Sequence, residues 1–257
     1  MPNIRVALPS HINTIPFIFG LQHHDVKDEI VLNLMEFPNS VQMLKSKKVD
    51  IALVPLEALQ QFDHYHVMGD YCLSSQREMQ FIFLILNGDF SNLTTIYIDD
   101  KSQVATSLVH ILTKGYWKCS PKFRPLPSSE TINNLKFGEA VLLAGNEDIA
   151  ENHKQDCLID LSAEWKKFTG LPLVVAVWVS LEPLHQTFTD QFNDALRLGI
   201  NSIDVALEGK IFSNDFPKAK VRRQLSQGIS YMFDHEKTIS MQLFLQLQAK
   251  IKVASAI

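Results

Sequence analysis

The first part of the chain alternates short apolar runs with stretches of helical spacing. Apolar runs at 4–8 and 49–55 are typical of strands that are buried on both faces of a sheet, and the alternating pattern at 31–37 predicts a further strand. Between them, residues 16–22 and 40–46 repeat their apolar side chains at the spacing of a helix. The order strand, helix, strand, helix, strand predicts an α/β unit with a mainly parallel sheet.

The first unit is expected to continue with a short helix at 56–61 and a strand at 80–86, and the turn-forming segment at 87–92 marks its expected end. A second series of strands and helices follows this segment. Asn39 and Ser162 are the expected caps of their helices. The second series is expected to contain strands at 95–98, 122–126, 139–144, 157–161 and 173–179, and helices at 103–113, 128–135, 147–152 and 162–168.

The character of the chain changes after Pro183, where the remaining residues are mostly amphipathic and helical. Helices are expected at 185–207, 218–226 and 238–252. Such a block must bury its apolar faces, and we expect it to return to the first unit. The predicted fold class is therefore α/β with two lobes and a helical C-terminal block, and the expected domains are lobe I at 1–88 plus 183–257 and lobe II at 89–182.

Residues 10–16 form the turn between the first predicted strand and the first predicted helix. Pro16 has no N–H to lose and its φ suits a first helical turn, so the helix is expected to begin there. Thr14 is then a candidate cap, because its hydroxyl can accept a bond from a free N–H of the first turn. The remaining free N–H groups and the positive end of the helix dipole favour a carboxylate or a phosphate.

Three further polar side chains lie in this turn. Ser10, His11 and Asn13 can add side-chain donors to a bound anion. In open α/β sheets, ligands bind beyond the carboxyl ends of the strands, which is where this turn is expected. The same spacing also fits an ordinary strand-to-helix turn with a good cap, so both interpretations remain open at this point.

Composition and charge narrow the classes of partner. The chain has 257 residues, a formal net charge of −4 and 46% hydrophobic residues, so we expect no nucleic-acid or membrane partner. Its three cysteines, Cys72, Cys119 and Cys157, have neither metal-site spacing nor the pattern of a disulfide framework. With no signal-peptide pattern at its start, the sequence is expected to be cytoplasmic.

The residue sequences of four segments resemble motifs of one protein family. Residues 10–16, Ser-His-Ile-Asn-Thr-Ile-Pro, resemble the Ser-Tyr-x-Asn-Thr-x-Pro opening of the chorismate dehydratases of the futalosine route to menaquinone. Residues 49–55 are similar to the family's Asp-x-Ala-Leu-Val-Pro segment, and 161–179 to its Glu-Trp, Thr-Gly-Leu-Pro and Ala-Val-Trp run. Residues 229–247 are similar to its last helix. The resemblance implies a type 2 periplasmic-binding-protein fold with a ligand cleft between two lobes.

The resemblance also implies a reaction. This family removes water from chorismate to give 3-[(1-carboxyvinyl)oxy]benzoate, without a metal or another cofactor. On this basis Asn13 would orient and polarise a carboxylate of the small carboxylated substrate. His11 stands where the family usually has Tyr, and it would pair with a carboxylate, stack on the substrate or act as a base. The implied substrate-binding residues are Ser10, Thr14, Ser102, Thr106 and Asn146.

Several positions depart from the family pattern and leave two alternatives open. The run 77–81 lacks the family's Gly-Pro-x-x-Ser residues, Leu56 replaces a common Ser, and Asn146 replaces a usual Asp. One alternative is a catalytically diverged intracellular protein that binds or senses a small carboxylate. The other is the sister enzyme that makes 1,4-dihydroxy-6-naphthoate. The sequence favours neither a monomer nor a homodimer. His64 and His66 could supply only two ligands to a metal ion, so no metal site is expected there.

Overall fold

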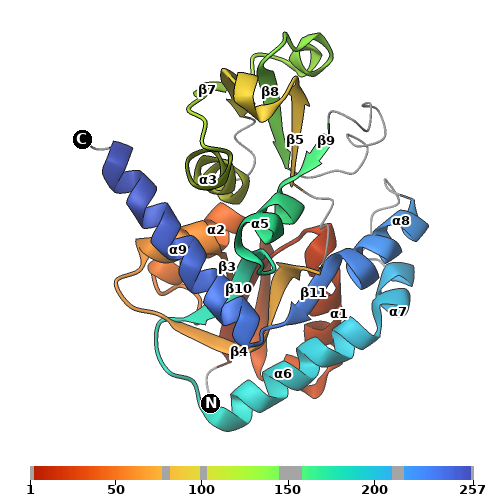
Figure 1. The fold of residues 1–257 in the computed structure, drawn as a ribbon. Helices are drawn as coiled ribbons and strands as arrows, with labels where there is room; N and C mark the ends of the chain where they lie inside the picture. Colours follow the sequence, from red (N-terminus) through yellow and green to blue (C-terminus); the bar gives the residue numbers. More distant parts are fainter. Residues whose placement is uncertain (1–2, 77–81, 99–102, 145–157, 210–216, 256–257) are drawn as a thin grey trace. The chain divides into compact units, whose positions relative to one another are not determined.

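The chain divides into two compact units. The computed structural model describes residues 3–76, 82–98, 103–144, 158–209 and 217–255 (Figure 1). The first unit holds Met1–Gln76 and Val174–Thr238, and the second holds Arg77–Leu173 and Ile239–Ile257. Each unit has a β-sheet of its own.

The first unit is built on a mixed sheet. Its strands are β1 Ile4–Pro9, β2 Ile30–Met35, β3 Ile51–Pro55, β4 His66–Ser75, β10 Val174–Ser180 and β11 Ile229–Met232. They lie in the order β11-β4-β10-β3-β1-β2. β1 is parallel to both β2 and β3, which confirms the parallel α/β opening that the sequence predicts. β10 is antiparallel to both of its neighbours, β3 and β4.

Helices cover both faces of this sheet. The longer ones are α1 Ile15–His23, α2 Phe37–Lys45, α6 Gln186–Asn201, α7 Ile203–Glu208 and α8 Lys218–Arg223. The short helical turns are η1 Ile12–Thr14, η2 Asp25–Asp28, η3 Leu56–Gln61 and the π-helical turn η8 Gln224–Gly228. Because parallel crossovers are right-handed and β1 lies between β2 and β3, α1 and α2 lie on opposite faces.

Two glycines bring α1 and α6 into backbone contact (Figure 1). A Cβ added at Gly20 would lie 1.9 Å from the carbonyl oxygen of Ala195, and one added at Gly199 would lie 1.7 Å from the carbonyl oxygen of Pro16. No side chain fits at either position, because real Cβ contacts do not come that close. The beginning of α1 is therefore held directly against the backbone of α6.

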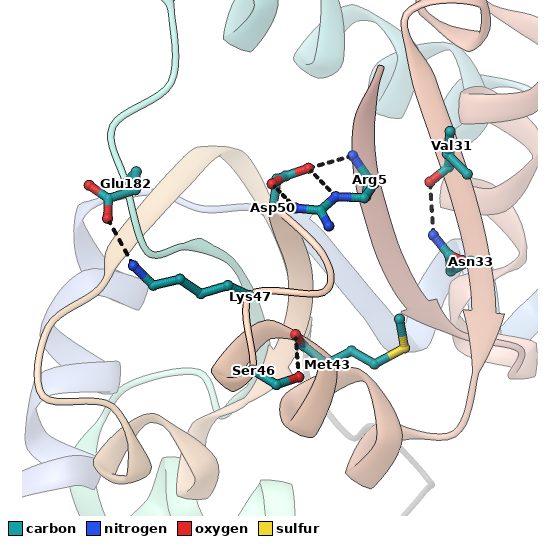
Figure 2. A network of polar contacts seen from close by, with 8 residues as sticks. All are labelled: Arg5, Val31, Asn33, Met43, Ser46, Lys47, Asp50 and Glu182. Carbon is teal, nitrogen blue, oxygen red and sulfur yellow. Dashed lines mark hydrogen bonds and ion pairs between the residues drawn. The ribbon is translucent and has the colours of Figure 1, made fainter. Parts of the chain in front are cut away.

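A group of polar contacts lies at the opposite end of β1 from the 10–16 turn (Figure 2). Arg5 donates from Nε to Asp50 Oδ2 at 2.9 Å and from its backbone N–H to the same oxygen at 2.8 Å. These hydrogen bonds, together with the positive charge of the guanidinium, lower the pKa of the Asp50 carboxyl. They join the start of β1 to the residue before β3, and nearby Lys47 pairs with Glu182 at 3.5 Å.

The second unit has a separate sheet and its own covering helices. The strands are β5 Ile82–Asn87, β6 Thr95–Ile98, β7 Lys122–Pro125, β8 Glu139–Ala144 and β9 Leu158–Asp160, in the order β7-β6-β8-β5-β9. The helices are α3 Gln103–Leu112, α5 Leu161–Thr169, most of α9 His235–Ser255, and the short turns η4 Phe90–Asn92, η5 Thr113–Trp117 and η6 Ser129–Asn134. β6 is parallel to β7 and β8, whereas β5 is antiparallel to β8 and β9.

The unit boundaries differ from the expected lobes of 1–88 plus 183–257 and 89–182. β5 belongs to the second unit because it pairs with β8 and β9, and β10 belongs to the first because it pairs with β3 and β4. The last helix also departs from the expectation that it covers the first unit. Within the second unit, Ser240 Oγ accepts a hydrogen bond from Trp165 Nε1 at 3.1 Å.

Four local details differ from the sequence expectations. The helix expected at 185–207 is interrupted at Ser202, which separates α6 from α7. The strand β11, which pairs with β4, was not expected within the helical block. Asp160, and not Ser162, caps α5, and Asn39 lies inside α2, which has Glu36 at its N-cap position.

In the described part of the chain, no helix has the length and apolar character needed to cross a membrane.

The contact between α1 and α6 generates the first prediction. Gly20→Ala and Gly199→Ala are each expected to lower the free energy of unfolding by about 3 kcal/mol or more, because overpacking here moves backbone rather than side chains. Gly209→Ala is the matched control in the same unit, since its φ of −80° and its nearest contact of 3.4 Å both accept a methyl group. Urea unfolding followed by circular dichroism measures all three. Equal stability of Gly20→Ala and Gly209→Ala would contradict the close approach.

Candidate functional site

The turn that follows β1 is the candidate site. β1 ends at Pro9, the 3-10 turn η1 follows, and α1 begins at Ile15. The N–H of Ser10 donates to the carbonyl of Met35 at 3.1 Å, which ties the turn to the end of the parallel strand β2. The turn therefore lies at the carboxyl edge of the parallel strands, where α/β proteins bind their ligands.

His11, and not Thr14, caps the helical segment. His11 Nδ1 accepts a hydrogen bond from the N–H of Asn13 at 3.2 Å, and Thr14 Oγ1 accepts one from the N–H of His11 at 3.2 Å. Thr14 stands at the N-cap position of α1, as expected, but its side chain makes no capping hydrogen bond to that helix, because η1 extends the helical backbone three residues toward β1. Thr14 is also the third residue of η1, where it completes a reciprocal capping box with His11.

The polar groups of this turn are largely used within the turn. Thr14 is fully buried, and its hydroxyl bonds to the carbonyls of Pro9 and His11. Its N–H donates to His11 O at 2.9 Å, and the N–H of Ile15 donates to Ile12 O. These N–H groups lie before Pro16, so the anion cradle expected from the free N–H groups after Pro16 stays a prediction. The geometry assigns Thr14 to holding the turn together.

Asn13 is the side chain that the turn leaves available for a ligand. It is 3% exposed, and its Oδ1 accepts a hydrogen bond of 2.7 Å from Nε2 of Gln224, which is 8% exposed. Within the described residues, the Asn13 side chain has no other hydrogen bond. The two amide hydrogens of Asn13 remain as donors, as the orientation of a carboxylate requires.

Gln224 is the site residue that the sequence analysis missed. It begins the π-helical turn η8 and lies 211 residues from Asn13 along the chain. The pattern at 218–226 predicts one amphipathic helix, in which a glutamine carries no signal of a ligand site. π-Helical turns often occur at functional sites, but they leave no clear pattern in a sequence.

An apolar cluster holds both halves of the site in place. The ring of Phe17 in α1 packs at 5.6 Å from each of Trp178 and Tyr231, measured between ring centroids. The hydroxyl of Tyr231 donates to the carbonyl of Leu225 at 3.1 Å, and burial raises the pKa of Tyr231. Trp178 is fully buried.

The surroundings of His11 define its protonation state. Burial lowers the pKa of His11 below its usual range, so the ring is neutral at neutral pH. Because Nδ1 accepts the N–H of Asn13, the single ring proton resides on Nε2. Of the roles that the sequence leaves open, hydrogen-bond donation to a carboxylate agrees with this tautomer, whereas a base would need the other one.

The other predicted site residues lie elsewhere or outside the described residues. Ser10 is exposed in the same turn, and Thr106 lies half-buried in α3 of the second unit. Ser102, Asn146 and the run 77–81 lie outside the described residues. The structure therefore brings together His11, Asn13 and Thr14, all from η1 and its cap.

Of the three cysteines, Cys72 and Cys119 lie in the described part of the chain, and Cys157 lies outside it. Burial raises the pKa of the Cys72 thiol to about 12, so this thiol is not a nucleophile at neutral pH. Among the residues that the structure describes, no group of three or more histidine, cysteine or acidic side chains could hold a metal ion.

The lowered pKa of His11 generates the second prediction. The unfolded chain protonates this ring near its usual pKa of 6.5, whereas the native turn resists protonation. The contribution of His11 to stability is therefore complete above that value and is lost as the pH falls toward the lowered pKa. His11→Asn keeps a side-chain cap that does not titrate, so the stability of the wild type relative to this variant should fall between about pH 8 and pH 5.

Urea unfolding of both proteins across this pH range measures the effect. The other histidines are common to both chains and cancel in the difference between them. A difference in stability that does not change with pH would rule out a buried, neutral His11.

The family of the chain follows from comparison with known proteins. Residues 4–250 match the sequence profile of a family described as Menaquinone biosynthesis. A search of curated protein sequences gives no significant match.

Similar solved structures show the fold. Protein AF1704 from Archaeoglobus fulgidus is 14% identical, with 98% of each chain covered and a TM-score of 0.73. The periplasmic aliphatic sulphonate binding protein of Escherichia coli is 11% identical, with 98% of this chain and 94% of that one covered and a TM-score of 0.63. An ABC transporter protein from Parabacteroides distasonis is 16% identical, with coverages of 97% and 93% and a TM-score of 0.62. The chain thus belongs to the menaquinone biosynthesis family and has a type 2 periplasmic-binding-protein-like fold with a helical C-terminal region.

Proposed function

We propose that the protein is a chorismate dehydratase of menaquinone biosynthesis, which converts chorismate to 3-[(1-carboxyvinyl)oxy]benzoate and water. The observation that carries the proposal is the buried amide of Asn13, whose N–H groups remain available in a chain that matches the menaquinone biosynthesis family. An oriented amide donor at the carboxyl edge of parallel strands suits a carboxylated substrate.

The reaction asks for positioning and for stabilisation of charge. The C–H bond at C3 and the C–O bond at C4 of the substrate ring break, the ring becomes aromatic, and the proton and the hydroxyl group leave as water. Aromatisation supplies the driving force. The protein has to hold the substrate in a reactive geometry and stabilise the charge that builds on the ring carboxylate.

The residues of the turn have separate roles in this proposal. The amide hydrogens of Asn13 donate to the ring carboxylate, and the neutral ring of His11 holds the backbone N–H of Asn13 through Nδ1. Thr14 and the capping box hold both side chains in position. The second carboxylate of the substrate, on its enolpyruvyl group, accepts the proton from C3.

A carboxylate-binding protein without catalysis is the second candidate. Leu56 follows Pro55 at the end of β3 and is 1% exposed, so an apolar side chain takes the place of the serine that is common in chorismate dehydratases. A solved structure of the same fold is described as an aliphatic sulphonate binding protein, and a sulphonate is an organic anion. Cytoplasmic location and a small carboxylated ligand are proposed for either candidate.

The third prediction tests the role of Asn13. The purified protein is incubated with chorismate, and mass spectrometry follows the loss of one water molecule against a control without protein. Asn13→Ala should lower kcat/KM by at least ~10-fold, because one charge-assisted hydrogen bond is lost. Asn13→Asp should lower it at least as much, since a carboxylate oxygen replaces the NH2 group and would repel the carboxylate of the substrate.

Asn33→Ala is the matched control for these variants. The Asn33 amide bonds only to backbone carbonyls of Val6 and Val31 in the described structure (Figure 2 shows the bond to Val31), so kcat/KM should stay near the wild-type value. Unchanged kinetics in folded Asn13→Ala would refute the site. Absence of turnover by the wild type, together with thermal stabilisation by chorismate, would favour the binding protein instead.

A further inference from the structure

The hydrogen bond between Gln224 and Asn13 joins two nearly buried amides. Gln224 Nε2 donates to Asn13 Oδ1 at 2.7 Å, and the exposed fractions of the two residues are 8% and 3%. A primary amide can turn either its oxygen or its two hydrogens toward a ligand. Because Gln224 holds the oxygen of Asn13, the hydrogens of Asn13 are directed away from η8.

We propose that Gln224 is a positioning residue that makes this site selective for anionic carboxylates over neutral amides. The proposal rests on the function proposed above and names the feature that gives the site its preference. With the Asn13 oxygen engaged, a carboxylate meets two N–H donors, whereas a reversed Asn13 would present an oxygen that repels it. Selectivity then depends on one neutral hydrogen bond and requires no positive charge beside the ligand.

The local structure keeps Gln224 in this orientation. The N–H of Gln224 donates to the carbonyls of Lys220 and Val221, which fixes the start of η8. The next residue, Leu225, is fully buried, and its carbonyl accepts the hydroxyl of Tyr231 at 3.1 Å.

The ring of Tyr231 packs on Phe17, in the same helix that begins just after Asn13. Both amides are therefore anchored to one apolar cluster of the first unit. Moving either amide would require this cluster to repack, so the orientation is built into the fold.

Among the described residues, His11 lies in the same turn as Asn13, and Tyr231 bonds to the carbonyl of the residue after Gln224. Burial lowers the pKa of His11 and raises the pKa of Tyr231. Arg222 is exposed and paired with Asp204 at 2.8 Å. Comparison with Gln224→Met therefore separates the titration of a new carboxylate at position 224 from that of the native groups.

Two substitutions separate orientation from packing. Gln224→Glu keeps the shape of the side chain, but its ionised form can only accept hydrogen bonds, so Asn13 must turn its hydrogens toward position 224. When the introduced carboxyl group is protonated, it again has a donor and permits the native orientation. Gln224→Met keeps the volume with no strong donor and does not titrate, so it controls for a purely structural loss.

The fourth prediction uses two readouts in one NMR experiment on the full chain. In Gln224→Glu, the side-chain amide signals of Asn13 should move with pH as the introduced carboxyl group ionises, whereas in wild type and Gln224→Met they should not show this titration. Benzoate, the anionic probe, should bind Gln224→Glu at least ~10-fold more weakly than wild type at about pH 8 and recover toward wild type at about pH 5. Benzamide, the neutral probe, should bind Gln224→Glu no more weakly than wild type.

Several outcomes would overturn the inference. Asn13 signals that do not respond to the introduced carboxyl group, benzoate affinity in Gln224→Glu equal to wild type at about pH 8, or failure of the wild type to prefer benzoate over benzamide would each do so. The outcome is distinct from that of the proposed function. Benzoate selectivity without turnover of chorismate would refute the dehydratase and leave the role of Gln224 intact, whereas turnover with an unresponsive Asn13 would do the reverse.

Discussion

The geometry of the candidate site depends on the close approach of α1 and α6. Gly199 meets the carbonyl of Pro16, and Gly20 meets the carbonyl of Ala195, so the two helix backbones touch without intervening side chains. Pro16 is three residues after Asn13. Any displacement of α1 would therefore move the Asn13 amide relative to η8, which the apolar cluster of Phe17 and Tyr231 fixes from the other side. The two glycines fix the position of α1, and the hydrogen bond from Gln224 fixes the orientation of the Asn13 amide.

The turn satisfies its own polar groups and thereby frees one side chain. The capping box between His11 and Thr14 uses the backbone N–H groups of His11 and Asn13. The side-chain amide hydrogens of Asn13 remain available among the described residues, while Gln224 holds the amide oxygen. Recognition in this turn therefore rests on a side chain whose own rotation is restrained.

The sequence predicts the strands and helices around this site better than it predicts the side-chain contacts within it. Apolar runs such as 49–55 identify buried strands because a strand that is buried on both faces needs apolar side chains at every position, and β3 is found there. The capping role of His11 could not be predicted, because it depends on a 3-10 turn that has no periodic pattern. The contact of Gln224 could not be predicted, because its partner lies 211 residues away and the sequence of its π-helical turn is typical of an ordinary α-helix. β11 is short and lies at the sheet edge, where pairing with β4 overrides the helical surroundings.

A site made of neutral donors has a consequence for catalysis. Neither the Asn13 amide nor the neutral His11 ring carries a charge, so a carboxylate in the ground state gains only moderate hydrogen bonds. In the dehydration proposed above, negative charge would grow on the ring carboxylate during loss of the C3 proton, and the same fixed donors would bind it more strongly. An uncharged, restrained amide is therefore compatible with the dehydration proposed above, and it limits the affinity for the ground-state substrate.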